Sequence, residues 1–357
     1  MSGEIYIDKF ILKNRLGKGS YGEVFLGRYN PDTVTFNCQD NNDGEIEDND
    51  LENVRDDVKI KVSDIPLAIK RIKNEPRFYR SAQREIRYLN ELKEHNDSNY
   101  PVVSFFESFE FNNILYLVFE KMEINLYSYY RQNKVTYSQV LKILKDVCRG
   151  LEFIHSRNII HGDLKPENIM LDSDFKNAKI IDFGSSFRYH KDEKRKYYYI
   201  QSRYYRAPEC CFELFVGKPI DIWSLGCIMY EILFRKPLFP AQNVKYDLIY
   251  YFTIYLGIPI NNPVSYNDYF LSPKFREYFK WNEYLQSYVI KVGQPQDLNP
   301  NPKGLMQKLN YKFHEIYPHH KFRETKTLMC QMITYDYYKR KTATEILENP
   351  IFDNFNN

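Results

Sequence analysis

The sequence lacks several patterns, and each absence narrows the class of protein. Its six cysteines include no C-x-x-C pair, which excludes a zinc site of the usual spacing and a disulfide framework. We therefore expect reduced thiols, as in a cytosolic or nuclear protein. The first ten residues, MSGEIYIDKF, lack the charged-then-apolar layout of a signal peptide. The longest apolar stretch, Leu248 to Ile260, is too short to cross a bilayer, and we expect a soluble protein that does not bind membranes.

The composition that remains is that of a globular protein with one unusual segment. The chain has 357 residues, of which 43% are hydrophobic and 27% charged, which suggests two lobes or domains. Residues 32–64 carry eleven acidic and three basic residues, so we expect a disordered acidic insert there. The rest of the chain carries a net charge of +11, which favours anionic ligands such as nucleotides. Because no RNP, zinc-finger or basic-helix motif accompanies this charge, we do not expect nucleic acid binding.

The order of strand and helix patterns predicts the fold class. A helical pattern covers residues 81–95, and from Leu126 to the end the pattern is helical apart from 159–209. Short β-rich segments precede and surround the first helix, at 10–16, 23–29, 65–72, 101–109 and 114–120. Strands first and helices later predict an α+β fold with two lobes. The pattern changes at 121–125, where we expect a hinge.

Residues 17–24 read GKGSYGEV, a G-x-G-x-x-G-x-V motif with β-type residues on both sides. Glycine lets a backbone turn sharply and approach phosphate oxygens without a Cβ in the way. A dinucleotide site would join a strand to a helix at this motif, so we interpret it as a hairpin over nucleotide phosphates. Lys70 ends the apolar strand LAIK and needs an anionic partner, which nucleotide phosphates and Glu85 can supply.

Two further motifs carry groups suited to phosphate chemistry. In His161-Gly162-Asp163-Leu164-Lys165-Pro166-Glu167-Asn168, Asp163 can accept the proton of a substrate hydroxyl and Lys165 can stabilise phosphoryl charge. Asn168 offers an oxygen to a hard cation, and Asp182 of the sequence IDFG offers a carboxylate to Mg²⁺. Each motif is short, but their order and spacing together are specific.

Taken together, these motifs resemble the protein-kinase signature set from the glycine loop to Ala207-Pro208-Glu209. The likeness covers about residues 8–353. The run YYYIQSRYYRAPE at 197–209 is similar to the dual-specificity tyrosine-regulated kinases, the DYRK/Yak group of the CMGC kinases. The homeodomain-interacting kinases are the closest rival. A pseudokinase scaffold is a further alternative, although Lys70, Asp163 and Asp182 are all present.

The resemblance implies a bilobal protein-kinase fold. Its N-lobe, at 10–120, would hold an antiparallel sheet and one main helix, after a short extension at 1–9. Its mainly helical C-lobe, at 126–353, would contain a CMGC-type insert at about 241–320. The sequence departs from the family at Gly162, where H-R-D motifs have Arg. That departure removes one Arg that commonly holds activation-loop phosphate.

The resemblance also implies ATP and Mg²⁺ as cofactors, and phosphorylation of protein Ser or Thr followed by Pro. Asp163, Lys165, Lys70 and Glu85 would be catalytic, and Asn168 and Asp182 would hold Mg²⁺. ATP would contact Leu16, Gly17, Lys18, Gly19, Ser20, Tyr21, Gly22, Glu23, Val24, Ala68, Lys70, Glu120 and Met122, with Phe119 guarding the inner pocket. Tyr199 would be phosphorylated by the kinase itself and then held by Arg203 and Arg206. We expect a monomer in the cytoplasm or nucleus.

Overall fold

The computed structural model describes residues 4–30, 65–95, 100–189, 200–214, 216–242, 247–259, 264–291, 304–316 and 322–355. The chain divides into two compact units, Met1–Ile86 with Ser104–Lys121, and Arg87–Val103 with Met122–Asn357. The acidic insert expected at 32–64 lies outside the described residues, as does part of the insert expected at 241–320. The predicted α+β class is confirmed by the sheet of the first unit and the helices of the second.

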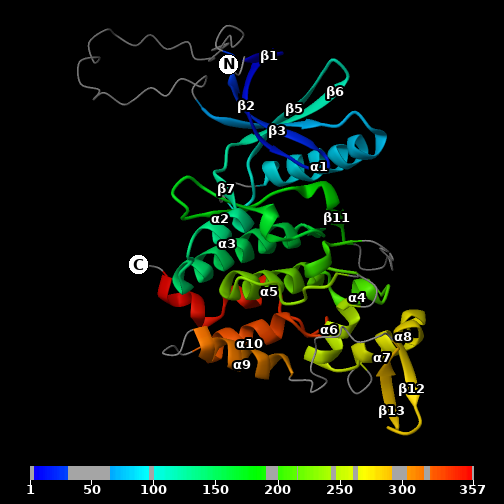
Figure 1. Cartoon of the computed structure of the whole chain (residues 1–357). Coiled ribbons are helices and arrows are strands. Elements are labelled where there is room, and N and C mark those ends of the chain that lie inside the picture. Colours follow the sequence, from blue (N-terminus) through cyan, green and yellow to red (C-terminus); the bar gives the residue numbers. More distant parts are fainter. Residues whose placement is uncertain are drawn as a thin grey trace, which may run out of the picture. The chain divides into compact units, whose positions relative to one another are not determined.

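The first unit is built on a six-stranded antiparallel sheet with the strand order β1-β2-β3-β4-β6-β5 (Figure 1). Its strands are β1 (Ile5–Ile7), β2 (Phe10–Lys18), β3 (Gly22–Tyr29), β4 (Leu67–Ile72), β5 (Phe105–Phe111) and β6 (Ile114–Glu120). Alternate apolar residues of these strands form a buried cluster that includes Phe10, Leu12, Leu67, Ile69, Tyr116 and Val118. This core fixes the register of β2, β3, β4 and β6, the strands that carry most of the predicted nucleotide-binding residues.

The helix α1 (Pro76–Glu94) starts in the first unit, and its turns from Arg87 onward belong to the second. It begins five residues before the predicted start at 81. Proline is favoured in the first turn of a helix, where its missing N–H needs no partner. Its buried face repeats at helical spacing and includes Ala82, Glu85, Leu89 and Leu92.

The second unit is mainly helical and surrounds α5 (Pro219–Phe234), which is buried from Ile220 to Phe234. A helix that is apolar all round belongs in the centre of a bundle, and α3 and α10 pack against it. The other helices are α2 (Leu126–Gln132), α3 (Tyr137–Ser156), α4 (Pro208–Cys211), α6 (Asp247–Leu256), α7 (Val264–Leu271), α8 (Pro273–Tyr278), α9 (Leu305–Ile316), α10 (Arg323–Met332) and α11 (Ala343–Leu347), with the 3₁₀ turns η2 (Pro166–Asn168), η3 (Phe183–Ser185), η4 (Arg203–Tyr205) and η5 (Pro350–Phe355).

Short strands position the predicted catalytic motifs in this unit. The sheet β10-β9-β7 contains β7 (Ile124–Asn125), β9 (Ile169–Leu171) and β10 (Ala178–Ile180), and a second sheet pairs β8 (Ile159–Ile160) with β11 (Phe187–Arg188). The strands β8 to β11 lie within the region 159–209 that the sequence sets apart from the helical pattern, whereas β7 lies at the end of the predicted hinge.

Two predictions of secondary structure were wrong. Residues 101–104 do not extend β5, because they bridge to Ile180: the N–H of Val103 donates to the Ile180 carbonyl, and the carbonyl of Pro101 accepts from the Ile180 N–H. The helical pattern does not run unbroken to the end, because β12 (Phe279–Asn282) and β13 (Ser287–Ile290) form a hairpin. Each of these strands has four residues, which is too short for an alternation to be recognised against the helices around it.

Within the described residues, no helix is long and apolar enough to cross a membrane.

Candidate active site

The glycine motif forms the turn between β2 and β3, as the sequence predicts. The backbone N–H of Gly19 donates to the carbonyl of Gly22 at 2.8 Å and closes the turn. A Cβ built on Gly17 or Gly19 would meet no atom within 4 Å, so their missing side chains leave open space beside the loop. A Cβ on Gly22, in contrast, would lie 1.9 Å from the carbonyl oxygen of Arg71. The first two glycines therefore fit close approach of a ligand, and the third is required by strand packing.

Three contacts that sequence reasoning missed hold this loop in place. Lys73 Nζ donates to the carbonyl of Ser20 at 2.7 Å, and the backbone N–H of Lys73 donates to the carbonyl of Tyr21 at 2.9 Å. The Tyr21 ring packs edge-on against Phe78 of α1, with 5.6 Å between ring centroids. Lys73 directly follows β4. A basic residue at this position was the only feature of the sequence that could have indicated its contact with the loop.

Lys70 of β4 and Glu85 of α1 form the ion pair that the sequence suggested. Lys70 Nζ lies 2.8 Å from Glu85 Oε2, and the two side chains are only 15% and 3% exposed. In the sheet, Lys70 stands opposite Val24 of β3 and Leu117 of β6. A buried pair of this kind fixes the direction of the lysine side chain, because an unpaired charge at this depth is costly.

The remaining residues predicted to bind ATP in the first unit lie along the same strands. Leu16, Lys18 and Ser20 are exposed at the end of β2 and in the turn, whereas Val24 and Ala68 are half-buried within the sheet. Glu23 instead forms ion pairs with Arg15 and Arg71 on the strand surface. The hydrogen bond from Arg15 lowers the pKa of the Glu23 carboxyl.

The end of β6 and the residues after it contain Glu120 and Met122, the two residues predicted to contact adenine through their backbone. The N–H of Glu120 donates to the carbonyl of Ser104 at 3.0 Å, and its carboxylate accepts from the N–H of Ser104. Glu120 therefore uses its own N–H within the first unit. Met122 is buried in the second unit, and no hydrogen bond to its backbone N–H is found within the described residues. Phe119, at the end of β6, is buried against Phe105.

In the second unit, the carboxylate of Asp163 is held at both oxygens. Lys165 Nζ lies 2.7 Å from Oδ2, and the backbone N–H of Ser202 donates to Oδ1 at 2.8 Å. Lys165 also donates to Ser202 Oγ at 3.2 Å. Burial lowers the pKa of Lys165, but the neighbouring carboxylates outweigh it, Asp163 most strongly, and the pKa is raised above its ordinary value. Lys165 therefore stays charged at neutral pH.

The backbone of this loop is positioned by a buried aspartate of α5. Asp221 accepts from the N–H groups of His161 and Gly162 at 2.9 and 3.0 Å, and from His155 Nε2 at 2.9 Å. Burial raises the pKa of Asp221, but its hydrogen bonds and the nearby histidines hold it below the ordinary value. Sequence reasoning assigned no role to Asp221, and its partners explain why a carboxylate is needed there.

Gly162 occupies a conformation that explains the missing Arg. Its φ is +76°, and a Cβ would lie 3.0 Å from the carbonyl oxygen of Ser185, with Ile200 and Phe187 each 3.2 Å away. An L-residue is strained at this φ, and a long side chain would also have to displace its neighbours. The packing of this loop therefore accommodates glycine at position 162 and disfavours the Arg of an H-R-D motif.

Asn168 and Asp182 present oxygen atoms suited to a hard cation. Asn168 Nδ2 donates to the carbonyl of Asp163 at 2.9 Å, which leaves Oδ1 as the acceptor end of the amide. The N–H of Ile181 donates to the carbonyl of Asn168 at 3.0 Å and ties the two motifs together. Asp182 has a left-handed backbone, with φ of +65°. Amide and carboxylate oxygens are ligands that Mg²⁺ accepts, so this donor set fits that ion.

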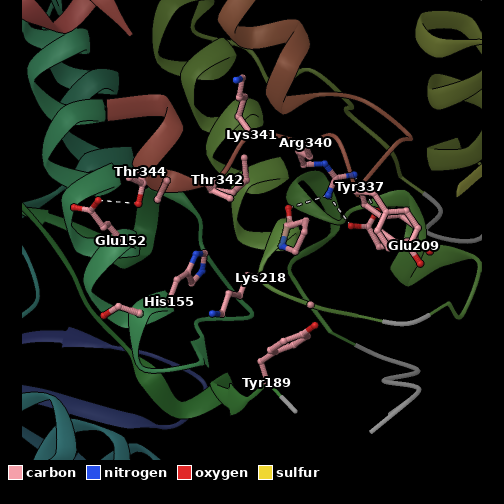
Figure 2. A pocket seen from close by; sticks show the side chains of 16 residues that line it. Glu152, His155, Tyr189, Glu209, Lys218, Tyr337, Arg340, Lys341, Thr342 and Thr344 are labelled. Carbon is pink, nitrogen blue, oxygen red and sulfur yellow. Dashed lines mark hydrogen bonds and ion pairs between the residues drawn. The ribbon is translucent and has the colours of Figure 1, made fainter. Parts of the chain in front are cut away.

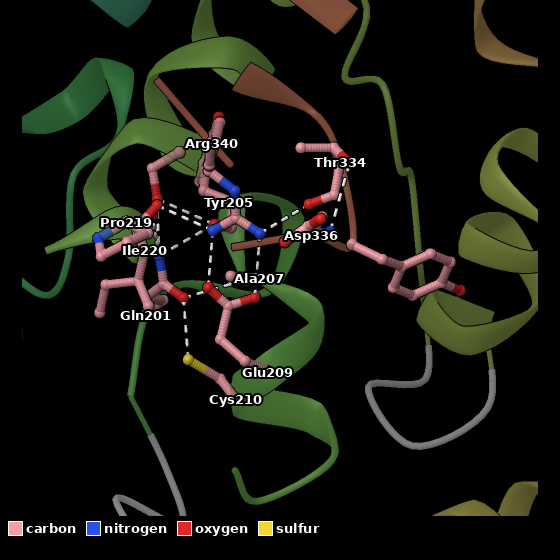
Figure 3. A network of polar contacts seen from close by, with 12 residues as sticks. Gln201, Tyr205, Ala207, Glu209, Cys210, Pro219, Ile220, Thr334, Asp336 and Arg340 are labelled. Carbon is pink, nitrogen blue, oxygen red and sulfur yellow. Dashed lines mark hydrogen bonds and ion pairs between the residues drawn. The ribbon is translucent and has the colours of Figure 1, made fainter. Parts of the chain in front are cut away.

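The segment after residue 199 is locked by the side chain of Gln201 (Figure 3). Its Nε2 donates to the carbonyl of Ile220 and to Ser224 Oγ, and its Oε1 accepts from the N–H of Ala207 at 2.9 Å. The backbone N–H of Gln201 donates to the carbonyl of Gly162 at 3.1 Å. These bonds fix the backbone that places Ser202 against Asp163. Sequence reasoning treated Gln201 and Ser202 only as parts of a family motif.

Arg340 and Glu209 anchor the end of this segment. The guanidinium forms a two-pronged pair with the carboxylate, at 2.6 and 3.1 Å, and both side chains are buried. Arg340 also donates to the carbonyls of Pro219 and Thr334 (Figure 3). Planar, charge-assisted pairs of this kind are among the strongest polar contacts in proteins.

The predicted phosphorylation site Tyr199 lies outside the described residues. Arg206 is buried and donates to the carbonyls of Ile200 and Gln201, both at 2.8 Å. Arg203 is exposed and contacts the carbonyl of Gln242. The contact of both arginines with a phosphate on Tyr199 stays a prediction.

Comparison with known proteins identifies relatives of this chain. The protein kinase domain family model matches residues 57–352, a range that begins after the glycine loop. Dual specificity tyrosine-phosphorylation-regulated kinase 3 of Rattus norvegicus is 43% identical over 183 residues, which cover 50% of this chain and 30% of the relative. Dual specificity tyrosine-phosphorylation-regulated kinase mbk-2 of Caenorhabditis elegans is 38% identical over 198 residues, covering 54% and 24%. Homeodomain-interacting protein kinase 1 of Mus musculus is 40% identical over 199 residues, covering 54% and 16%. The matched segments thus span less than a third of each relative.

Proposed function

The chain belongs to the protein kinase family, and from that premise we propose that it transfers the γ-phosphoryl group of ATP to serine and threonine hydroxyls of proteins. The observation that carries the proposal is the carboxylate of Asp163, held between the ammonium of Lys165 and the N–H of Ser202. A carboxylate fixed at both oxygens can orient a hydroxyl and accept its proton, while the adjacent ammonium offsets charge on the transferring group.

The other predicted residues have supporting roles in this proposal. Lys70, fixed by Glu85, contacts the phosphates of ATP, and the loop 17–22 covers them with backbone groups. Glu120 and Met122 meet the adenine through their backbone. Asn168 and Asp182 would hold Mg²⁺, which neutralises phosphate charge when bound. Phosphoryl transfer needs positioning and charge stabilisation more than covalent chemistry, and this set of residues supplies both.

A peptide assay with radiolabelled ATP tests the activity. Asp163→Asn and Lys70→Met should each reduce turnover at least about 100-fold, because a lost transition-state contact costs several kcal/mol. Asp174→Asn is a matched control, since Asp174 is exposed and its carboxylate lies 3.5 Å from the ammonium of the likewise exposed Lys176. If wild-type protein showed no transfer while Asp163 and Lys70 were intact, the chain would be a pseudokinase scaffold. Near-normal turnover of either variant would contradict the assigned mechanism.

Substrate preference and self-activation are finer parts of the proposal. Paired peptides that differ only in Pro or Ala after the acceptor Ser test whether the kinase is directed by Pro. The names of the relatives support phosphorylation of tyrosine as well, and we assign it to Tyr199 of the same chain. Bacterially produced wild-type protein should carry phosphate on Tyr199, and the Asp163→Asn variant should carry none. Phosphotyrosine on that variant, measured by peptide mapping, would refute self-modification.

A further inference from the structure

A cavity of about 440 Å³ opens in the second unit, away from the residues assigned to catalysis (Figure 2). It is lined by the last turns of α3, the start of α5, Tyr189 after β11 and the segment 337–344 that leads into α11. None of Asp163, Lys165 and Asn168 lines it. Its volume falls in the range of sites that enclose small molecules, about 300–1,000 Å³.

Aromatic and apolar side chains form much of the wall. Tyr337 is buried and Tyr338 is 66% exposed, and their ring centroids lie 4.5 Å apart. Tyr189, Pro219 and Ile222 also line the cavity. Such walls favour a ligand with a flat apolar body, which stacks on or packs edge-on against tyrosine rings.

The cavity also contains a cation, Lys218, with which no carboxylate of the described residues forms an ion pair. Lys218, the residue before α5, is half-buried, and its ammonium lies over the Tyr189 ring, 5.6 Å from the centroid. Burial alone lowers the pKa of Lys218. A half-buried ammonium in this state gains free energy when an anion is placed beside it.

The carboxylates of the lining are already engaged with other residues. Glu209 pairs with both terminal nitrogens of Arg340, and Glu152 accepts from Thr344 Oγ1 at 2.8 Å. Neither acid compensates the charge of Lys218, so the lining favours an acceptor-bearing ligand beside that ammonium.

We propose that this cavity is a binding site for a small aromatic carboxylate. The carboxylate lies beside Lys218, and the aromatic body packs against Tyr337 and Tyr338. The site lies apart from the predicted catalytic residues, and its ligand is neither ATP nor the protein substrate. Its existence does not depend on the proposed kinase activity.

Photolabelling with 4-benzoylbenzoate tests the site directly, since this probe is an aromatic carboxylate that cross-links to its surroundings. Full-length protein is irradiated over a range of probe concentrations with excess ATP present, so that labelling of a nucleotide site is suppressed. Peptide mapping should find adducts on peptides that contain Tyr189, 217–222 or 337–344. Lys218→Met should raise the half-saturating concentration about tenfold, because it removes a charge-assisted contact. Tyr338→Ala should also weaken labelling.

Two controls distinguish binding at this site from non-specific labelling by the probe. Lys236→Met removes an exposed lysine outside the cavity lining and should leave labelling unchanged. Neutral 4-(hydroxymethyl)benzophenone should need about tenfold more probe than the carboxylate. Lys218 makes no side-chain cap for α5, so its loss should not unfold the protein, which a thermal melt checks. Absence of adducts on these peptides, equal labelling by the neutral probe, or unchanged labelling of both Lys218→Met and Tyr338→Ala would overturn the proposal.

Discussion

At the scale of single residues, the backbone conformation explains why particular amino acids occupy certain positions of the site. Gly162 replaces the Arg of an H-R-D motif because its φ is +76° and its surroundings are full. Asp182 and Gln201 also have left-handed backbones, and both begin segments that carry predicted functional groups. Strained backbone at such positions is maintained by the contacts around it, as the hydrogen bonds of Gln201 illustrate.

We expect Gly162→Ala to destabilise the protein and lower turnover. Strain at positive φ costs about 1–2 kcal/mol, and the crowding by Ser185, Phe187 and Ile200 adds to it. Gly257→Ala is the matched control, because Gly257 has φ of +81° but nothing within 4 Å of its added Cβ. Thermal melts and peptide turnover of both variants measure the difference. Equal melting temperatures of the two variants would show that the residues around Gly162 accommodate the added Cβ without a loss of stability.

The glycine loop offers a second comparison between neighbouring residues. Gly19→Ala should leave the melting temperature unchanged but raise the KM for ATP several-fold, because its Cβ enters the open space beside the loop. Gly22→Ala should lower the melting temperature, because its Cβ would meet the Arg71 carbonyl at 1.9 Å. If both variants changed only the KM for ATP, the close packing of β3 on β4 would be less strict than the structure indicates.

At the scale of helices and strands, the sequence predicts those features that depend on neighbouring residues along the chain. The strand 114–120 is found at its predicted bounds because a continuous apolar run marks a central strand. The Lys70–Glu85 pair follows from a charge at the end of a buried strand and an acid on the buried face of a helix. The contact between Ser202 and Asp163 could not be predicted from the residues alone, because it joins positions 39 apart through tertiary structure. The hairpin 279–290 was missed because its short strands carry no clear alternation.

Lys308 lies where α9 packs on α6, and two effects of opposite sign act on its charge. Lys308 Nζ lies 3.9 Å from the centroid of the Tyr255 ring and 5.7 Å from that of Tyr230. Burial, with a contribution from Lys312, lowers the pKa of Lys308 to about 8, whereas the hydrogen bond that Nζ donates to the Tyr255 hydroxyl and the ring faces favour the charged form. Below pH 8 the folded protein carries this charge at a cost, and the cost disappears as the pH rises toward the ordinary lysine pKa.

We therefore expect Lys308→Met to stabilise the protein by about 1–3 kcal/mol at pH 7, with a smaller gain at pH 10. Chemical denaturation at the two pH values measures this, and Lys280→Met, at an exposed position of β12, should show no such dependence. A variant less stable than wild type at pH 7 would mean that the tyrosine rings stabilise the ammonium more than burial penalises it.

At the scale of the whole molecule, the small net charge conceals an uneven distribution. The chain has a net charge of +3, but the eleven acidic and three basic residues of 32–64 leave the remainder strongly basic. The insert joins two strands that are already paired, since Gly27 of β3 stands opposite Leu67 of β4. The sheet therefore holds β3 and β4, the strands on either side of the insert in the sequence, next to each other, and a short connection between them is feasible.

We expect that replacing residues 32–64 by an Asn-Gly turn will leave peptide kinase activity unchanged and keep or slightly raise the melting temperature. Eight residues, 28–31, the Asn-Gly pair and 65–66, would still connect the paired residues Gly27 and Leu67, and shortening the connection lowers the entropic cost of closing the loop by about 2 kcal/mol at most. The shortened protein should also elute from heparin at higher salt, because its net charge becomes more positive. A scrambled insert of the same composition is the matched control and should behave as wild type in all three measurements. A large fall in melting temperature or activity on deletion, with the scrambled insert also impaired, would instead show that the specific sequence of 32–64 packs on the first unit or regulates it.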